Sequence, residues 1–224
     1  MKQLQFKTDR ALESEGKSSK AIYLTVAKLI NSQSGKVVDF GCGQGDFCKF
    51  LDLSKQKYIG VDLVHYPEFP RNCEFIESDL DAGQIKLPDN YAEAVCSIET
   101  IEHLENPRAL MRELVRITKP GGLLILTTPN QLSLLSKLTL IFKNQFNAFQ
   151  AAPGCYPAHI TALLEIDLAR IAAECQLTSI EIHYTNYGRI PGSSQAYPQW
   201  LGFRGRLFSD NVILSALKPV NVSE

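Results

Sequence analysis

Hydrophobic residues recur along the chain in two alternating patterns. Short apolar runs such as 36–40 and 94–98 have the length and composition of buried strands. Other segments, such as 18–31, place apolar residues three or four positions apart, the spacing of a helix that covers a sheet. We therefore expect helices at 18–31, 46–53, 132–142 and 163–175, a further helix that Pro107 opens and Pro120-Gly121-Gly122 stops, and strands at 36–40, 58–63, 74–77, 94–98, 123–127, 178–184 and 211–217.

This alternation of strand and helix predicts an α/β fold in which a mostly parallel sheet carries helices on both faces. No helical pattern separates 178–184 from 211–217, so the last strand is expected to be antiparallel. The length of 224 residues suits a single domain over 1–224, with 129–160 as a lid-like insertion and 185–209 as a long loop.

Composition narrows the function classes. The formal charge of −1 lacks the basic excess of a nucleic-acid-binding surface, so nucleic acid is an unlikely partner. Residues 1–10 lack the apolar core of a signal peptide, and no apolar stretch approaches the ~20 residues that span a bilayer. Together with six scattered cysteines that form no Cys-x-x-Cys pair, this predicts a cytoplasmic protein with reduced thiols.

Three glycines at alternate positions follow the first strand directly. Gly41, Gly43 and Gly45 come after Asp39, and the next strand ends in another acid, Asp62. Glycine tolerates a sharp turn, and a side chain at these positions would block close backbone approach to a ligand. An acid at the end of the next strand can accept both ribose hydroxyls of a nucleoside. The pattern predicts a nucleoside pocket at the carboxyl edge of the sheet.

The spacing Gly-x-Gly-x-Gly departs from the dinucleotide fingerprint and resembles motif I of the class I S-adenosylmethionine-dependent methyltransferases. Glu77-Ser78-Asp79-Leu80 looks like the adenine motif of that family, and Lys119-Pro120-Gly121-Gly122 before the fifth strand is also typical of it. The resemblance implies a Rossmann-like seven-stranded fold and S-adenosylmethionine as cofactor. Its implied cofactor-binding residues are Asp39, Gly41, Cys42, Gly43, Gly45, Asp62, Leu63, Asp79, Leu80 and Glu99.

A second cluster of chemically active residues follows the fourth strand. If residues 99–103 turn helically, Glu99, Glu102 and His103 project from one face. Two carboxylates and an imidazole converging in a cleft have the chemistry of a divalent-metal site. His159, just before the helix at 163–175, is the candidate fourth ligand.

This Glu-x-x-Glu-His segment is similar to that of the ubiquinone-biosynthesis O-methyltransferases and of the small-RNA 2′-O-methyltransferases. The resemblance implies Mg²⁺ or Mn²⁺ on Glu99, Glu102, His103 and His159, and it makes Glu102, His103 and His159 the candidate catalytic residues. Two alternatives stay open for these side chains. One of the histidines acts as a general base without metal, or the residues only cap the next helix and border the cofactor.

We interpret the chain as an enzyme that O-methylates a small or medium-sized hydroxylated metabolite. The alternatives are 2′-O-methylation of an RNA end, against which the charge argues, and a non-catalytic cofactor-binding regulator. The apolar segment 129–160 is a packing element, a lid over the acceptor, or a helix in peripheral contact with a membrane. The loop at 185–209 mixes aromatic residues with arginines that could contact a ring or a phosphate. The sequence gives no indication of the oligomeric state.

Overall fold

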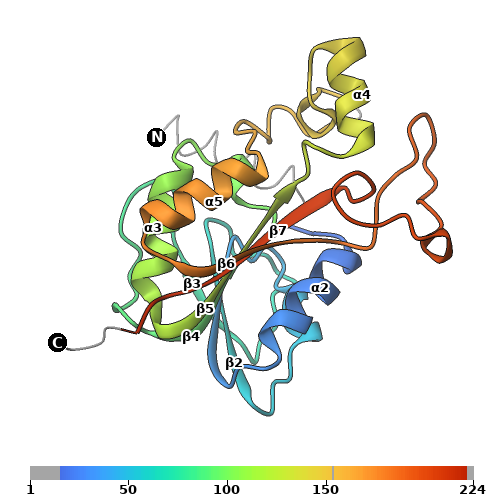
Figure 1. Ribbon diagram of the computed structural model, residues 1–224. Helices are drawn as coiled ribbons and strands as arrows, with labels where there is room; N and C mark the ends of the chain where they lie inside the picture. Colours follow the sequence, from blue (N-terminus) through green and yellow to red (C-terminus); the bar gives the residue numbers. More distant parts are fainter. Residues whose placement is uncertain (1–15, 153, 221–224) are drawn as a thin grey trace.

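The computed structural model describes residues 16–152 and 154–220. A single sheet of seven strands in the order β3-β2-β1-β4-β5-β7-β6 runs through the middle of this part of the chain (Figure 1). The expectations on residues 1–10 lie outside the described residues. The strands are β1 (Gly35–Phe40), β2 (Gln56–Asp62), β3 (Glu74–Glu77), β4 (Ala92–Ser97), β5 (Thr118–Pro129), β6 (Thr178–Tyr184) and β7 (Asn211–Leu217).

The sheet is mixed in the way the sequence pattern predicts. The strands from β3 to β5 pair in parallel, whereas β7 pairs antiparallel with both β5 and β6. The chain thus returns from β6 to insert its last strand between two earlier ones. The predicted seven-stranded fold with an antiparallel last strand is confirmed.

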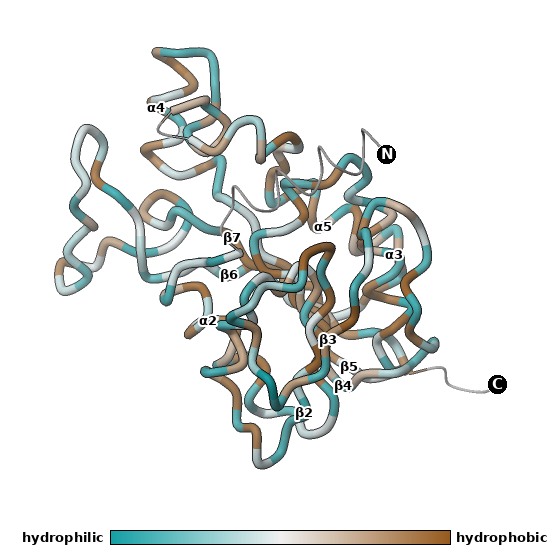
Figure 2. Tube along the Cα trace, turned by 180° about the vertical axis from the view of Figure 1, so that it is seen from behind, coloured by the Kyte–Doolittle hydropathy of each residue, from teal (hydrophilic) through white to brown (hydrophobic). Residues whose placement is uncertain are grey.

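Helices cover both faces of the sheet (Figure 1). On one face lie α2 (Lys20–Ile30) and the 3-10 helix η1 (Asp46–Phe50), and on the other lie α3 (Pro107–Ile117) and α5 (Glu165–Glu174). Successive residues of β1 point to opposite faces of the sheet. Val37 packs on the face that α2 covers, and Val38 packs on the face that α3 and α5 cover. Figure 2 shows the hydrophobic segments gathered along the central strands.

Two local predictions are wrong. The predicted helix at 46–53 is the short 3-10 helix η1, which ends at Phe50. The turn at Pro120-Gly121-Gly122 does not precede the fifth strand but lies inside it, because β5 begins at Thr118 and the pairing with β4 shifts register between Ala92 and Ala94. Helix α3 ends at Ile117, and the Pro-Gly-Gly segment belongs to β5, an interior strand between β4 and β7.

The predicted helix at 132–142 is present as α4 (Leu134–Lys143), which projects from the body of the molecule (Figure 1). The Ser133 hydroxyl caps its amino end, and Asn144 in the left-handed region ends it. It packs against the 3-10 helix η3 (Asn147–Phe149), and Ser136 is its one buried residue. Ile141 and Phe142 are 70% and 80% exposed. Packing on the sheet therefore does not account for the apolar character of α4.

Two short 3-10 helices complete the described secondary structure, η2 (Ile101–His103) and η4 (Gln199–Leu201). The second lies in the predicted loop at 185–209, where Trp200 is exposed. None of the helices within 16–152 and 154–220 has both the length and the apolar content to cross a membrane. The division into one domain with a lid and a loop stays a prediction.

Candidate functional site

The carboxyl ends of the parallel strands open onto one cavity of about 720 Å³. Ligands bind at this edge in open α/β sheets because the strand ends diverge there. All of the predicted cofactor-binding residues except Gly45 line the cavity, and so do His103 and His159. The cavity extends under the amino end of α4, where Ser133, Leu135 and Ser136 contribute to its wall.

The three glycines of the loop after β1 all have positive φ angles, +75° at Gly41, +52° at Gly43 and +74° at Gly45. A Cβ atom at Gly43 would lie 2.2 Å from the carbonyl oxygen of Gly16, and one at Gly41 would lie 2.1 Å from Oγ1 of Thr100. The predicted sharp turn that needs glycine is present, and the space that glycine keeps for a ligand stays a prediction. These glycines are required by the backbone conformation and by close packing against the protein itself.

Asp62 joins this loop to the end of β2. Its carboxylate accepts hydrogen bonds from the backbone N–H of Gly43 at 2.8 Å and from that of Val64 at 3.2 Å. Burial raises the pKa of Asp62, and these backbone donors oppose the rise. The carboxylate lies on the cavity wall, as a ribose-binding acid must.

Asp39 borders the same cavity, but its carboxylate is engaged within the protein. It accepts hydrogen bonds from the Tyr58 hydroxyl at 2.8 Å and from the Cys96 thiol at 3.5 Å. Burial raises the pKa of Asp39 to about 7. Its side chain therefore links β1 to β2 and β4, and its contact with the cofactor stays a prediction.

The predicted adenine motif contributes Asp79 and Leu80 to the cavity wall, to which Leu63 and Cys42 also belong. Asp79 Oδ1 accepts the backbone N–H of Asp81 at 2.9 Å, which makes a local turn, and Leu80 is 8% exposed. Both residues line the cavity, which is what the motif requires.

Glu99 departs from the predicted geometry. The residue has φ +50°, and the 3-10 helix η2 begins only at Ile101, so Glu99, Glu102 and His103 do not project from one helical face. The Glu99 carboxylate instead accepts hydrogen bonds from the Thr127 hydroxyl at 2.9 Å and from the Asn211 amide at 2.8 Å. Burial raises its pKa to about 7, and these two donors oppose the rise. The prediction of Glu99 as a metal ligand is not supported by this geometry.

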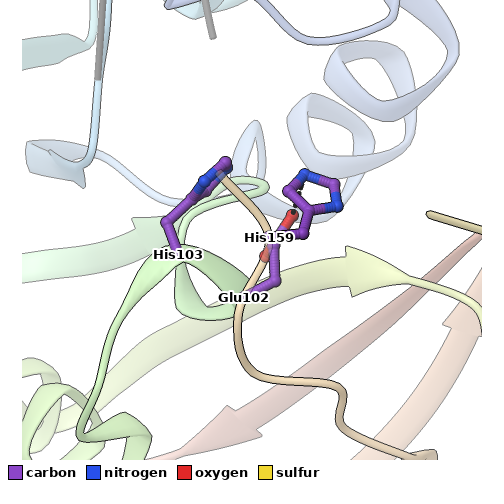
Figure 3. A group of neighbouring side chains, drawn as sticks. All are labelled: Glu102, His103 and His159. Carbon is purple, nitrogen blue, oxygen red and sulfur yellow. Dashed lines mark ion pairs between the residues drawn. The ribbon is translucent and has the colours of Figure 1, made fainter. Parts of the chain in front are cut away.

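The other three predicted ligands lie together. Glu102, His103 and His159 each offer one ligand atom, and these atoms lie within 4.8 Å of one another. Figure 3 shows the Glu102 carboxylate pointing toward the His159 ring, with Oε1 at 4.0 Å from Nε2. The two imidazole rings meet edge to face with their centroids 4.7 Å apart. The fold thus brings together the side chains of His103 and His159, which are far apart in the sequence.

Backbone carbonyls orient both imidazoles. His103 Nδ1 lies 3.0 Å from the carbonyl oxygen of Ala158, and His159 Nδ1 lies 3.0 Å from that of Ala148. A carbonyl can only accept, so each Nδ1 carries a proton, and in the neutral form of each ring Nε2 carries the lone pair. A histidine that ligates a metal usually donates its other ring N–H to a carbonyl or a carboxylate in this way.

The cluster is largely shielded from solvent. Glu102 is 0% exposed, its Oε2 accepts the Thr128 hydroxyl at 3.2 Å, and its Oε1 has no hydrogen-bond partner among the described residues. Burial, together with the Glu99 carboxylate, raises the pKa of Glu102 well above its ordinary value. Burial, with His103 adding to the effect, lowers the pKa of His159 to about 4. A neutral imidazole beside an unpartnered carboxylate oxygen is a site that a cation would complete.

Sequence reasoning missed one part of the wall. Residues 16–19, just ahead of α2, line the cavity and approach the glycine loop, with the backbone N–H of Gln44 donating to the carbonyl oxygen of Gly16 at 3.1 Å. Tyr66 also lines the cavity. Residues 18 and 19 were predicted as the start of the helix at 18–31, whereas α2 begins at Lys20, and the sequence pattern placed no element at residues 16 and 17.

Comparison with known proteins agrees with this geometry. Residues 16–181 match the family model of a methyltransferase domain. The chain belongs to the class I S-adenosylmethionine-dependent methyltransferases. The predicted membership in this family is confirmed, and it implies S-adenosylmethionine as cofactor. The side chains that contact it stay predictions.

Curated relatives of this methyltransferase match about half of it. The mitochondrial ubiquinone biosynthesis O-methyltransferase of Dictyostelium discoideum is 28% identical over 128 residues, which cover 49% of this chain and 40% of the relative. The ubiquinone biosynthesis O-methyltransferase of Pseudomonas fluorescens is 26% identical over 115 residues, which cover 47% of this chain and 49% of the relative. The chain spans less than half the length of these curated relatives.

A solved structure from Thermotoga maritima, described as an S-adenosylmethionine-dependent methyltransferase and possible histamine N-methyltransferase, has the same fold. It superimposes with a TM-score of 0.66 over 88% of this chain and 87% of its own, at 18% identity. At this identity the likeness concerns the fold alone, so the acceptor has to be argued from the residues of the cavity.

Proposed function

We propose that this methyltransferase methylates a hydroxyl oxygen of a small or medium-sized metabolite, with a divalent metal ion bound by Glu102, His103 and His159. The observation behind the proposal is the convergence of three ligand atoms of these residues within 4.8 Å. The buried Oε1 of Glu102 has no hydrogen-bond partner among the described residues, which supports the same site. The named O-methyltransferase activity of the curated relatives supports an oxygen acceptor.

The donor set fits Mn²⁺ better than Mg²⁺. One carboxylate and two imidazoles offer mixed oxygen and nitrogen ligands, whereas Mg²⁺ prefers oxygen ligands alone. When bound, S-adenosylmethionine supplies an electrophilic methyl group, and the metal lowers the pKa of an acceptor hydroxyl and orients it.

The residues of the cavity have separate tasks in this proposal. Asp62 accepts the ribose hydroxyls, and the glycine loop holds the Asp62 carboxylate in place through the Gly43 N–H. The neutral His159 keeps a lone pair on Nε2 at pH 7 because its pKa is about 4. Leu135 and Ala148 form apolar wall that excludes water from the transfer.

A metal-free mechanism is the competing proposal. There, Nε2 of His159 or His103 takes the proton of the acceptor hydroxyl directly. The two proposals use the same side chains and differ in their response to chelation.

The decisive experiment measures Mn²⁺ binding to protein that has been stripped of metal with EDTA. Electron paramagnetic resonance reports the concentration of free Mn²⁺ during the titration. We expect one Mn²⁺ per chain in the wild type and loss of binding in Glu102→Gln and His159→Asn. His183→Asn is the matched control, because His183 lies on β6 and contacts Ser215 instead.

Activity is followed in the same samples as release of S-adenosylhomocysteine with a panel of small hydroxylated metabolites. Loss of turnover in EDTA and recovery with Mn²⁺ supports the metal. Full turnover in chelator contradicts it and favours the histidine base.

A further inference from the structure

Two long segments of the chain, residues 129–164 and 182–209, contain no aspartate or glutamate. The first includes α4, and the second includes η4. All 24 acidic residues of the chain lie outside the two segments, whereas five basic residues lie within them, Lys137, Lys143, Arg189, Arg204 and Arg206. The net charge of −1 therefore results from a basic part and an acidic remainder.

The fold joins the two acid-free segments near the amino end of α4. The Leu134 backbone N–H donates to the carbonyl oxygen of Leu207 at 2.9 Å. The Asn130 side-chain amide donates to the carbonyl oxygens of Arg206 at 2.7 Å and of Ser209 at 2.8 Å. Both segments project from the same side of the molecule, as the two opposite views show (Figures 1 and 2). A partner that approaches from this side can contact both.

Large apolar side chains are exposed on both segments. On α4, Leu140, Ile141 and Phe142 are 40%, 70% and 80% exposed. At η4, Trp200 and Leu201 are 83% and 54% exposed. Soluble proteins rarely leave groups of such side chains in water unless the surface binds a partner.

The position of Trp200 is set by an aromatic cluster within its own loop. Three rings contact one another at centroid distances from 4.9 to 5.4 Å, those of Tyr197, Phe203 and Phe208. Because η4 lies between Tyr197 and Phe203, these contacts hold the chain on both sides of it. The exposed indole is therefore carried on a packed part of the loop.

Some of the cations on this side are available to an anionic partner. Two of the five are paired with acids, Arg189 with Asp210 and Arg206 with Glu165. The other three have no ion-pair partner within residues 16–152 and 154–220, namely Lys137, Lys143 and Arg204. A soluble polyanion would neutralise these cations and leave the apolar side chains in water. A bilayer with anionic headgroups takes up both kinds of side chain.

We propose that α4 and η4 dock this protein on the surface of an anionic phospholipid membrane. Phe142 and Trp200 enter the boundary between headgroups and acyl chains, where tryptophan is favoured because its ring is apolar and its N–H is polar. The three available cations bind the lipid phosphates. The loop at 185–209 is thus a second anchor beside α4, and the docking depends neither on the metal nor on the acceptor.

Trp200 is the one tryptophan of the chain, so its fluorescence reports on η4 without a label. The full chain is titrated with vesicles of phosphatidylcholine that contain phosphatidylglycerol, and with vesicles of phosphatidylcholine alone. We expect a blue shift of the emission with the anionic vesicles only, and quenching of the emission when their acyl chains carry bromine. Added salt should weaken the binding, because it screens exposed charges.

Two pairs of variants separate charge from apolar contact. Arg204→Gln should weaken binding to the anionic vesicles about fivefold, the effect of one cation near such a surface. Its matched control is Lys86→Gln, at an exposed lysine between β3 and β4, which should change nothing.

Trp200→Ser removes the fluorescent reporter, so its binding is measured by sedimentation with the vesicles. It should bind about tenfold more weakly than the wild type, because a large apolar side chain no longer leaves water. Leu53→Ser, at an exposed leucine ahead of β2, is the matched control and should bind as the wild type does. All four variants should keep the wild-type thermal midpoint, since the replaced side chains are exposed.

An equal response to the neutral and the anionic vesicles, or a response to neither, overturns the proposal. Binding to anionic vesicles without quenching of Trp200 overturns the role of η4. A blue shift with soluble polyglutamate and none with vesicles would assign this surface to an acidic protein, and it would overturn membrane docking as well.

Discussion

The Asp62 carboxylate accepts the backbone N–H of Gly43 at 2.8 Å, so the end of β2 holds the glycine loop that follows β1. This bond couples the two parts of the predicted cofactor pocket. A change at Asp62 should act on the ribose contact and on the loop together.

Asp62→Ala should weaken S-adenosylhomocysteine binding about 10- to 100-fold, since it removes charge-assisted hydrogen bonds to the ribose and to the loop. Isothermal calorimetry measures the loss. Glu68→Ala, an exposed acid in the loop after β2, is the control. Unchanged affinity of the Asp62 variant would remove this residue from the cofactor site.

Glu99 and Glu102 should respond differently to replacement by glutamine. Glu102→Gln should lower Mn²⁺ affinity at least tenfold, because ligands of this kind are charged oxygen donors. Glu99→Gln should change it less than about threefold, since its carboxylate contacts Thr127 and Asn211. Calorimetric titration of the two variants with Mn²⁺ compares them, and an equal loss in both would restore Glu99 as a ligand.

Asp39 should make the stability of the metal-free protein depend on pH. Its pKa rises from 3.8 to about 7 in the folded state, so folding takes up a proton between these values. The free energy of unfolding should therefore decrease as pH rises from about 4 to about 7, by an amount of the order of a few kcal/mol.

Urea unfolding at several pH values, with Asp39→Asn beside the wild type, measures this dependence. The variant should have a shallower decrease, and Glu68→Gln should have the wild-type one. The same slope in the wild type and Asp39→Asn would show that another group binds the proton.

The exposed apolar end of α4 should contact anionic lipid. Ile141 and Phe142 face solvent, and the same helix carries Lys137 and Lys143, whose ammonium groups would meet the headgroups of such a membrane. The wild type should float with phosphatidylglycerol vesicles in a density gradient. The double variant Ile141→Ser, Phe142→Ser should stay in the bottom fraction of the gradient. The double variant should keep its thermal midpoint, because the replaced side chains are exposed. Flotation of neither protein would favour α4 as a lid alone.

Much of the fold was predictable because its elements obey strong periodic patterns. The strands after the glycine loop and the antiparallel pairing of β6 with β7 follow from alternating apolar runs and from a missing helix. The start of β5 was not predictable, since Pro120-Gly121-Gly122 reads as a break and only pairing with neighbours makes it part of a strand.

Part of the candidate site was predictable from the sequence, and part of it was not. Residue chemistry brought Glu102, His103 and His159 together in the sequence analysis, and the fold places them together. The direction of Glu99 escaped prediction because a glutamate at positive φ is set by its tertiary partners, Thr127 and Asn211, rather than by local preference. Residues 16–19 escaped it because their position depends on contacts with the distant glycine loop.

The placement of β7 between β5 and β6 has a consequence for synthesis on the ribosome. Residues 211–217 emerge after every other strand, yet they occupy an interior position of the sheet. Until they emerge, Pro129 has no partner in β7 and Glu99 has no Asn211. A nascent chain therefore contains the glycine loop long before Asn211 can bond Glu99. The cavity wall at Glu99 is complete only after β7 has been synthesised.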